Sequence, residues 1–547
     1  MRTSLIHRLG RGLRRVAGRL PADPQVAPLR AQLLAWRAEP RRTSSAATPA
    51  PKSALAGRVL AVQGVEDPMF YGLLAALASD LQQATGVRPS LLQVRSINGA
   101  IGTGLLPALA RSVPLSALLN AQWRRAHAGL IEDIGYRSAG WGPPGAAARR
   151  RRRARKLIRD LPEGGLGTLS IAGILVGDLL IDSYLRFRPA VTVDLQDPFL
   201  VQLLAQLLRD LDLAQNWFAR KRPALYLSSY STYVEHGVAV RVALARGVPV
   251  RVFGNLVTFG KRLSLQDPYH AANGDGYDAI AASLTEPALA RAAAMLERRL
   301  SGQIDAATSY MRQSAYAASG EPVPDVRGAV VVFLHDFFDS PHVYADLVFD
   351  DFWQWVGCTI RTLQAAGIPF YLKPHPNQVQ ASADVLVQLQ ATFPGVRLLS
   401  TRVTNRQLAE AGLGAGVTVY GTVGHELAYL GVPVISCARH PHHEFGFCRT
   451  AASVSEYEAM LRQPFERALP REAMRQQASQ FYYAHNLHGS DQALALRSRF
   501  ANLFKAGGDT TDPTAVAAAL VALRSEPAWA EFVQDLVHDM SSPSRGS

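Results

Sequence analysis

With 547 residues, the chain is longer than one hydrophobic core usually supports, so the sequence predicts two α/β domains with additional tails. Its three cysteines lack CxxC spacing, which argues against a disulfide framework and against a zinc site, and fits a reducing compartment. The formal net charge of +14 is concentrated in two segments. Residues 1–42 contain ten arginines and two acidic residues, and residues 149–156 contain six arginines and one lysine. The remaining chain is nearly neutral, so its charge gives no indication of nucleic-acid binding.

The N-terminal residues 1–52 are predicted to be a basic tail and linker, because they are rich in Arg, Pro and Ala. Within residues 2–20, apolar side chains recur at helical spacing with arginines between them, which indicates an interfacial helix on an anionic membrane surface. A solvated tail without a partner is the alternative. No segment has the length of a membrane span or the layout of a signal peptide, so we expect a cytoplasmic protein, peripheral at the inner face of the cytoplasmic membrane.

Residues 53–325 are predicted to form an N-terminal Rossmann-like domain with a connecting helix at about residues 286–315. The short β-rich runs RVLAVQG, ALYLSS and VPVRVFG alternate with helical stretches, which favours a parallel sheet covered on both faces. The arginine run at 149–156 follows GWGPPGAAA and precedes LPEGGLGTL, so we predict that it lies in a connecting loop, either against an acidic partner or in solvent.

Residues 326–510 are predicted to form a second Rossmann-like domain, followed by C-terminal helices and a tail at 511–547. The runs AVVVFLH, PFYLKPH, VRLLS, VTVYG and VPVISC are interpreted as its five strands. A helix is predicted over residues 343–367, between the first two of them.

The stretch VTVYGTVGHELAYLGVPVI, residues 417–435, predicts a strand, a tight glycine turn and a helix. Gly421 and Gly424 flank Thr422, where the helix is predicted to begin. Backbone N–H groups and the helix dipole at such a turn favour a bound phosphate, and the Thr422 hydroxyl adds a donor. Glu426 follows within the first turns and is placed to accept the hydroxyls of a ribose. The alternative is that the glycines only allow close packing.

A second candidate site is YLKPHP, residues 371–376, at the end of another predicted strand. The two prolines restrict the backbone around Lys373 and His375, which fixes a cation and an imidazole at the edge of the sheet. Both side chains suit a phosphate leaving group, because they offset the negative charge that develops when a sugar–phosphate bond breaks.

The loop after the first strand of the second domain contains His335 and Asp336, which are further candidates because ligands of open α/β sheets bind at this edge. His342 and the pair Asp350 and Asp351 are predicted to lie on the following helix as surface or capping groups.

In the first domain, Asp178 and Asp182 have the i,i+4 spacing that places two side chains on one face of a helix. Asp178 directly follows an apolar run, where a charge is costly without a partner or a function, so it is the first catalytic candidate and Glu235 is the second. A structural ion pair between Asp178 and Arg186, or a helix cap, is the alternative of nearly equal weight.

These residues resemble the bacterial capsular and surface polysaccharide biosynthesis proteins, a GT-B glycosyltransferase group that includes retaining Kdo transferases. The similarity rests on GDLLIDSYLR, HDFFDSPHVYADLVFDDFWQW, YLKPHPNQ and GTVGHELAYLGVPVI with its continuation HPHHEFGFCRTAASVSEYEAML, in that order. It covers residues 56–465. His425, where a small or apolar residue is expected before Glu426, departs from the pattern.

The resemblance implies two Rossmann-like domains facing a cleft, with the acceptor on the first domain and the nucleotide sugar on the second. It implies that Lys373 and His375 bind the donor phosphate, that the turn at Gly421 and Gly424 binds the nucleotide, and that Glu426 binds its ribose. The donor would be CMP-Kdo or another nucleotide sugar, and the acceptor a glycan or glycolipid. No motif requires a metal or a cofactor.

Two other functions are compatible with the same residues. A glycerol- or ribitol-phosphate transferase of surface polymer synthesis shares the KPHP and glycine-turn strings, and product analysis would distinguish it. A non-catalytic partner in a polysaccharide export complex would keep the fold without turnover.

Overall fold

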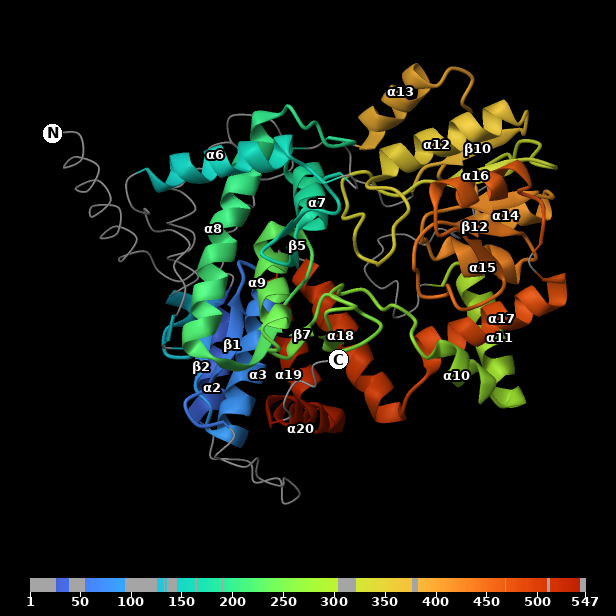
Figure 1. Cartoon of the computed structure of the whole chain (residues 1–547). Helices are drawn as coiled ribbons and strands as arrows, with labels where there is room; N and C mark the ends of the chain where they lie inside the picture. The colour runs from blue at the N-terminus through green and yellow to red at the C-terminus, as the bar shows by residue number, and fades with distance from the viewer. Residues whose placement is uncertain are drawn as a thin grey trace. The chain divides into compact units, whose positions relative to one another are not determined.

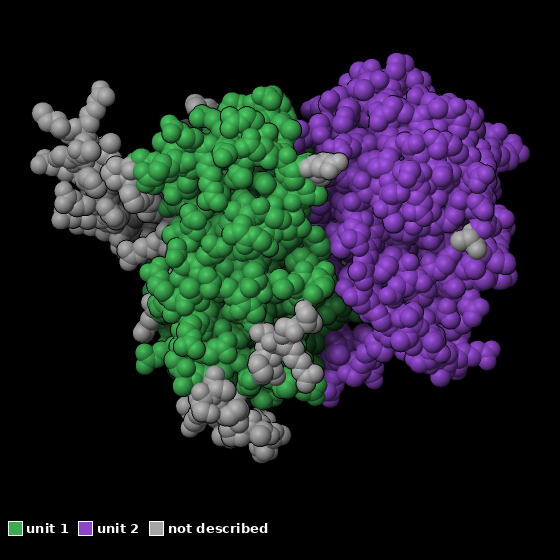
Figure 2. All heavy atoms as spheres, in the orientation of Figure 1, with its two compact units in different colours: residues 1–188, 194–270, 495–547 green, residues 189–193, 271–494 purple. Residues whose placement is uncertain are grey.

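A computed structural model describes most of the chain, which folds into two compact units (Figure 2). The described residues are 26–38, 55–93, 125–131, 133–134, 145–162, 165–188, 190–303, 321–375, 382–467, 469–508 and 512–541. Unit 1 consists of Met1–Arg188, Asp194–His270 and Ala495–Ser547, and unit 2 of Pro189–Val193 and Ala271–Leu494. The membrane helix expected at residues 2–20 lies outside the described residues.

Unit 1 contains a six-stranded sheet in the order β3-β2-β1-β6-β7-β8 (Figure 1). Its strands are β1 (Val59–Gly64), β2 (Pro89–Gln93), β3 (Asp133–Ile134), β6 (Pro223–Ser228), β7 (Val250–Val252) and β8 (Lys261–Leu263). Neighbours are parallel except β7 and β8. The short hairpin of β4 (Ser170–Ile171) and β5 (Ile174–Leu175) lies outside this sheet. When the hairpin is left out, the strand order is that of the Rossmann fold.

Helices from both ends of the chain pack on the core of unit 1. The helices of this unit are α2 (Ala27–Ala38), α3 (Pro68–Thr85), α6 (Ala146–Arg159), α7 (Gly177–Phe187), α8 (Pro198–Lys221), α9 (Tyr233–Ala245), α18 (Asp491–Gly508), α19 (Pro513–Arg524) and α20 (Pro527–Ser541). Helix α3 begins where Asp67 accepts a hydrogen bond from the Phe70 N–H, with proline at the first helical position, and ends at Gly86 with φ of 75°. These are the start and stop signals expected of an α-helix.

The prediction that residues 1–52 form a tail and linker is wrong in part, because α2 packs into the core of unit 1. Leu29, Leu33 and Trp36 have the spacing of one helical face and are buried in the same core as α3 and α19. The Arg37 guanidinium donates to the backbone carbonyl of Leu130 at 3.0 Å, and the Arg524 guanidinium lies 4.4 Å from the centre of the Trp36 ring. The arginines of this segment therefore cover a packed helix, whereas composition alone favoured a linker.

Unit 2 contains a five-stranded parallel sheet in the order β10-β9-β11-β12-β13. Its strands are β9 (Val330–Phe333), β10 (Phe370–Lys373), β11 (Ala415–Val417), β12 (Val434–Ser436) and β13 (Cys448–Thr450). In chain order this is 2-1-3-4-5, a doubly wound arrangement. All four residues of β9 are buried, because alternate side chains enter cores on the two faces of the sheet.

Helices cover both faces of the unit 2 sheet. The helices are α10 (Tyr277–Ala282), α11 (Glu286–Leu300), α12 (Phe352–Ala365), α13 (Ser382–Thr392), α14 (Asn405–Glu410), α15 (Val423–Tyr429), α16 (Val454–Arg462), α17 (Arg471–Tyr482) and the π-helical turn Tyr483–Leu487. Side chains of α11, α14, α15 and α17 enter one core, and those of α12, α13 and α16 enter the other. Both units are therefore Rossmann-like, and the predicted α/β class with two such domains is confirmed.

The compact units divide the chain at 270 and 494, whereas the predicted domain boundaries fall near 325 and 510. Hydrophobic burial explains both differences. Leu296 of α11 packs into the unit 2 core, so the connecting helix joins the second domain. Leu496 and Phe500 of α18 pack into the unit 1 core, so the chain returns to the first domain before its C-terminal helices.

Three local predictions are wrong. The run VRLLS contributes a single bridge, Leu372 to Leu398, instead of a strand. The strand expected from VTVYG lies slightly earlier, at Ala415–Val417, which leaves the residues after Val417 to form the loop at the sheet edge. The helix expected over 343–367 begins only at Phe352, where the Asp351 carboxylate caps it by accepting from the Gln354 N–H at 2.8 Å.

The arginine run at 149–156 lies in α6, so its predicted placement in a loop is wrong. Arginine, alanine and lysine are strong helix formers, and Gly145, in a left-handed conformation with φ of 76°, provides the start. Ala154 is fully buried, while most of the arginines around it are exposed, so α6 packs through its small residues. Among the described helices, none is long and apolar enough to span a bilayer.

Candidate active site

The strand order of each sheet defines a switch point, where ligands of open α/β sheets bind outside the carboxyl ends of the strands. In unit 1 the switch point lies between β1 and β6, and in unit 2 between β9 and β11. The segments that follow these four strands, together with the end of β10, hold the candidate residues except Asp178, which lies in α7 after the hairpin of β4 and β5.

His335 follows β9 at the switch point of unit 2. Its Nε2 atom accepts from the Val419 N–H at 3.4 Å and lies 3.1 Å from the Thr418 hydroxyl. The ring stacks on Phe352 with 4.7 Å between ring centres. Burial, assisted by the charge of His375, lowers the pKa of His335 to about 3. The imidazole is therefore neutral near pH 7 and holds the loop after β11 in place.

Asp336 connects the loop after β9 to the start of α13. Its Oδ1 atom accepts from the Phe338 N–H at 3.1 Å and from the Ser382 hydroxyl at 3.0 Å. Burial lowers the pKa of His375, and the Asp336 carboxylate opposes that effect. The carboxylate and the imidazole thus lie within electrostatic reach of each other, as expected for groups at one edge of the sheet.

Lys373 is the last residue of β10, and only 3% of its surface is exposed. Burial lowers the pKa of its ammonium group to about 8, and the carboxylate of Glu426 acts in the opposite direction. The structure brings Lys373, His375, His335 and Asp336 to the carboxyl edge of neighbouring strands β10 and β9. This is the arrangement predicted from the YLKPHP and FLHDFF runs.

The glycine turn precedes α15, for which Thr422 is the N-terminal cap residue. The Gly421 N–H donates to the Thr418 hydroxyl at 3.2 Å, and the Gly424 N–H donates to the Gly421 carbonyl at 3.0 Å. A Cβ atom on Gly424 would lie 2.5 Å from Nε2 of His442. Close packing, the alternative interpretation of these glycines, therefore accounts for Gly424.

Glu426 lies in α15 and forms a buried ion pair that the sequence did not reveal. Arg299 of α11 donates to its Oε1 atom from both Nε and Nη2, each at 2.8 Å. Asn405 donates to Oε2 at 3.4 Å. Both partners of the ion pair are less than a tenth exposed. Arg299 thus fixes the orientation of the carboxylate proposed to meet a ribose.

Asp178 lies in the first turn of α7, and the predicted helix across Asp178 and Asp182 is present. Its carboxylate pairs with Arg241 of α9 at 2.5 Å, with both side chains buried, and accepts from the Leu179 N–H at 2.9 Å. The alternative role of Asp178, a structural ion pair, is therefore present, although its partner is Arg241 instead of Arg186.

Glu235 belongs to a polar cluster at the switch point of unit 1. Its Oε1 atom lies 3.3 Å from Nε2 of His236, whose Nδ1 atom is 2.9 Å from Nε2 of Gln63. Gln63 in turn accepts from the backbone N–H of Ser229 at 2.8 Å. These contacts link the carboxyl ends of β1 and β6 and hold His236 between a carboxylate and an amide.

Glu66, which follows β1, is a functional candidate that the sequence analysis missed. Burial, with the like charge of Glu235, raises the pKa of Glu66 to about 7. Its Oε1 atom is buried and has no hydrogen-bond partner among the described residues. Two carboxyl groups with one raised pKa are typical of acid–base catalysis. The position of Glu66 in the sequence could have indicated this role, because Glu66 follows the first buried strand of a Rossmann-like domain.

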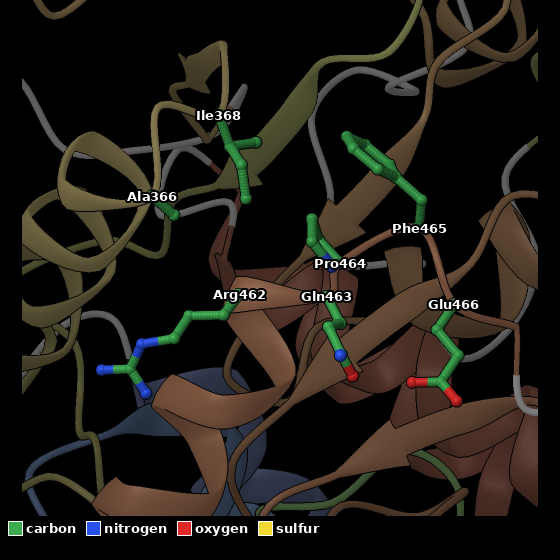
Figure 3. Close-up of a pocket in the computed structure, with 7 residues that line it drawn as sticks. All are labelled: Ala366, Ile368, Arg462, Gln463, Pro464, Phe465 and Glu466. Atoms are coloured by element: carbon green, nitrogen blue, oxygen red, sulfur yellow. The ribbon is translucent and has the colours of Figure 1, made fainter.

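A pocket of about 520 Å³ lies elsewhere in unit 2 (Figure 3). It is lined by Ala366, Ile368, Arg462, Gln463, Pro464, Phe465 and Glu466. Ile368 precedes β10, so this pocket lies at the amino ends of the strands, opposite the edge that holds Lys373 and His375. It does not belong to the candidate site.

The chain matches no protein-family model and no curated protein. Among solved structures, it is similar to the S. aureus MnaA–UDP co-structure, with 10% identity, a TM-score of 0.24, and coverage of 82% of this chain and 96% of that one. A UDP-N-acetylglucosamine 2-epimerase has 12% identity, a TM-score of 0.20 and coverage of 83% and 96%. The spinosyn rhamnosyltransferase SpnG, complexed with spinosyn aglycone, has 12% identity, a TM-score of 0.19 and coverage of 87% and 99%.

Proposed function

We propose that the protein is a GT-B glycosyltransferase that moves a sugar from a nucleotide-activated donor to a growing surface or capsular polysaccharide. The observation that carries the proposal is the buried Lys373 with His375 at the carboxyl edge of the unit 2 sheet. A buried ammonium group is costly unless an anion compensates its charge, and a donor phosphate supplies that anion. Lys373 and His375 would then stabilise the phosphate as it leaves the sugar.

In this proposal the nucleotide lies along the turn at Gly421 and Thr422, and Glu426, held by Arg299, accepts the ribose hydroxyls. Arg299 donates to Oε1 of Glu426 and Asn405 donates to Oε2 at 3.4 Å, so a ribose hydroxyl would share Oε2 with Asn405. The resemblance to surface polysaccharide enzymes makes CMP-Kdo the first donor to test.

The acid–base group is proposed to come from the switch point of unit 1. Glu66 and Glu235 replace Asp178 as the first candidates, because Asp178 is neutralised by Arg241. A carboxylate acts as the base in an inverting transfer and as the nucleophile or ion-pair partner in a retaining one.

The donor is tested with the full chain in a thermal-shift screen against CMP, CDP, UDP, GDP and dTDP, because a ligand that binds only the folded state raises its stability. We expect one nucleotide to raise the melting temperature. Transfer of a sugar, instead of a polyol phosphate, is then checked by mass spectrometry of the product. A phosphodiester product, or no response to any of the five nucleotides, would contradict the proposal.

The His375→Ala variant is expected to bind the selected nucleotide about tenfold to a hundredfold more weakly, because a charge-assisted hydrogen bond is worth roughly 1.5–3 kcal/mol. Isothermal titration calorimetry measures the affinity. His488→Ala, which changes an exposed histidine of the same unit, is the matched control. Equal affinity of a folded His375→Ala protein and the control would exclude His375 from the donor site.

Peripheral membrane association through residues 2–20 is also proposed, because of their apolar stripe with adjacent arginines. Deleting residues 1–22 is expected to reduce flotation with anionic liposomes, most clearly at low salt. The deletion must stop before α2, since Leu29 and Leu33 are buried in the unit 1 core. Charge reversal at Arg151 and Arg152 of α6 serves as the control for general basicity. Undiminished flotation of the truncated protein would rule out this anchor.

A further inference from the structure

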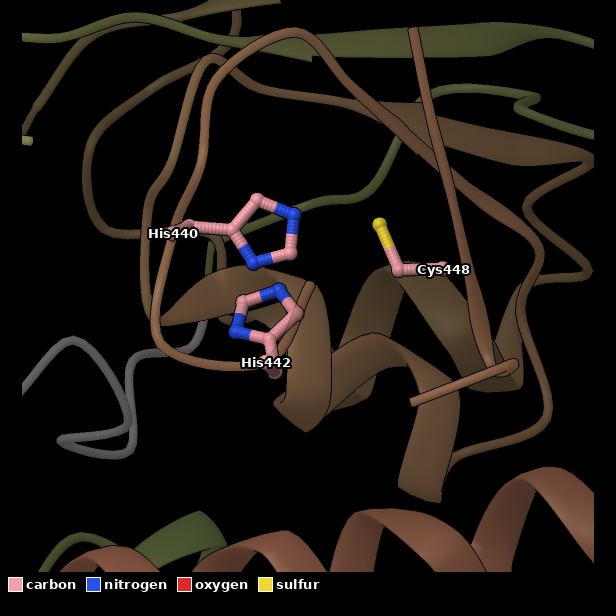
Figure 4. Close-up of side chains that lie close together, drawn as sticks. All are labelled: His440, His442 and Cys448. Carbon is pink, nitrogen blue, oxygen red and sulfur yellow. The ribbon is translucent and has the colours of Figure 1, made fainter. Parts of the chain in front are cut away.

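The loop that joins β12 to β13 brings two imidazoles next to a thiol. His440 and His442 belong to this loop, and Cys448 is the first residue of β13. One ligand atom from each residue lies within 4.8 Å of the other two. The two ring centres are 3.8 Å apart. Figure 4 shows the two rings beside each other and the thiol next to them. All three residues are buried, with at most 6% of their surface exposed.

Each of the two histidine rings has a buried nitrogen for which the described residues offer no hydrogen-bond partner. Nε2 of His440 lies 2.7 Å from the Ser436 hydroxyl and 2.9 Å from the Thr450 hydroxyl. Within the described part of the chain, Nδ1 of His440 and Nε2 of His442 are buried without a hydrogen-bond partner. Buried polar atoms of this kind are rare and destabilising, because they lose their hydrogen bonds to water on folding without forming others.

The two hydroxyl contacts match the second shell of a metal-binding histidine. A ligating histidine typically donates its other ring N–H to a nearby oxygen, which fixes its tautomer and orientation. If Nε2 of His440 donates to Ser436 or Thr450, its Nδ1 atom carries the lone pair that can bind a metal. Gly424 leaves room for His442, since a Cβ atom there would lie 2.5 Å from the unpartnered Nε2.

We propose that His440, His442 and Cys448 form a binding site for a divalent transition-metal ion, with zinc as the best match to two imidazoles and one thiolate. In a tetrahedral site with metal–ligand bonds of about 2.0–2.3 Å, the ligand atoms lie about 3.4–3.6 Å from one another. The ligand atoms of the three residues lie within 4.8 Å of one another, so side-chain rotations that move these atoms by on the order of 1 Å complete the site. On binding, the Cys448 thiol releases its proton to solvent and its sulfur forms the metal bond. The fourth position is left for water or another oxygen ligand.

The ion would fasten the loop between Ser436 and Cys448 to the edge of the unit 2 sheet, beneath α15. This site is independent of the proposed transferase function, because it uses none of the residues assigned to the donor. A second group, Asp275, His443 and Glu444, is more exposed, and Asp275 already pairs with Arg439 at 2.9 Å. It contains no sulfur, so the two groups can be distinguished by spectroscopy.

The test is titration of the full, chelator-treated protein with Co²⁺, followed by near-ultraviolet and visible absorption, with Zn²⁺ added in competition. We expect about one Co²⁺ per chain, a thiolate-to-cobalt charge-transfer band and visible bands of tetrahedral intensity, all removed by Zn²⁺. Cys448→Ser is expected to lose the charge-transfer band and to weaken binding at least about tenfold. Cys358→Ser, which changes another buried cysteine of unit 2, keeps both.

Absence of Co²⁺ binding by the folded wild-type protein would overturn the proposal. So would binding without a charge-transfer band, because that result would assign the ion to the carboxylate group at Asp275. If Cys448→Ser fails to fold, His442→Asn replaces it, and retention of full Co²⁺ affinity in that variant would equally reject the site.

Discussion

Replacing Glu66 by glutamine is expected to lower the rate of the proposed sugar transfer about a hundredfold, because the variant cannot accept a proton. In the wild-type protein, the rate is expected to fall as the pH drops below about 7, where Glu66 becomes protonated. The measurement is the pH profile of kcat/KM with the donor that the nucleotide screen selects. Glu531→Gln, at an exposed site of unit 1, is the matched control.

The same substitution makes a prediction about stability that needs no substrate. Because the pKa of Glu66 rises from 4.5 to about 7 on folding, the folded protein retains a proton in this range that the unfolded chain has released. Stability therefore falls as the pH rises through this window. Glutamine does not ionise, so Glu66→Gln removes this pH-dependent loss of stability. At pH 8 the free energy of unfolding of the variant is expected to exceed that of the wild type by roughly 1–3 kcal/mol. Normal turnover with an unchanged pH profile would remove Glu66 from the mechanism, whatever its stability.

Replacing Arg299 by methionine is expected to lower the free energy of unfolding by about 3–5 kcal/mol, because it leaves the buried carboxylate of Glu426 without its cation. Urea unfolding at neutral pH measures this loss as a lower midpoint. Arg298→Met changes the neighbouring, exposed arginine of α11 and is expected to cost little.

A double variant separates the lost charge pair from lost packing. When Glu426→Leu accompanies Arg299→Met, the carboxylate that lost its cation is removed as well, so part of the lost stability is expected to return. The return is incomplete because the buried Lys373 also loses the favourable charge of Glu426. If Arg299→Met is no more destabilising than Arg298→Met, the ion pair does not fix Glu426 in the way described here. If the double variant is as unstable as the single one, packing by the arginine stem explains the loss instead.

Periodicity in the sequence predicted the α/β architecture because parallel strands buried on both faces are apolar throughout. Val330–Phe333 and Pro223–Ser228 were both recognised for this reason. Segments whose patterns are weaker were misread. Arginines and prolines typical of a linker lie in and around α2. The apolar stripe of this helix could be interpreted only once the structure showed that it packs on α3 and α19. The arginine run of α6 shows no apolar stripe at all, although its residues favour a helix.

The sequence alone was enough to predict that Lys373, His375, His335 and Asp336 lie at one edge of one sheet, because they stand at or just after the ends of buried parallel strands. Which charged side chains form ion pairs became visible only in the three-dimensional structure. Arg241 reaches Asp178 across 63 positions, and Arg299 reaches Glu426 across 127. It also brought Glu66 beside Glu235, and His440 and His442 beside Cys448. Such pairings depend on how helices pack on a sheet, and no local spacing encodes the distance between side chains from separate elements.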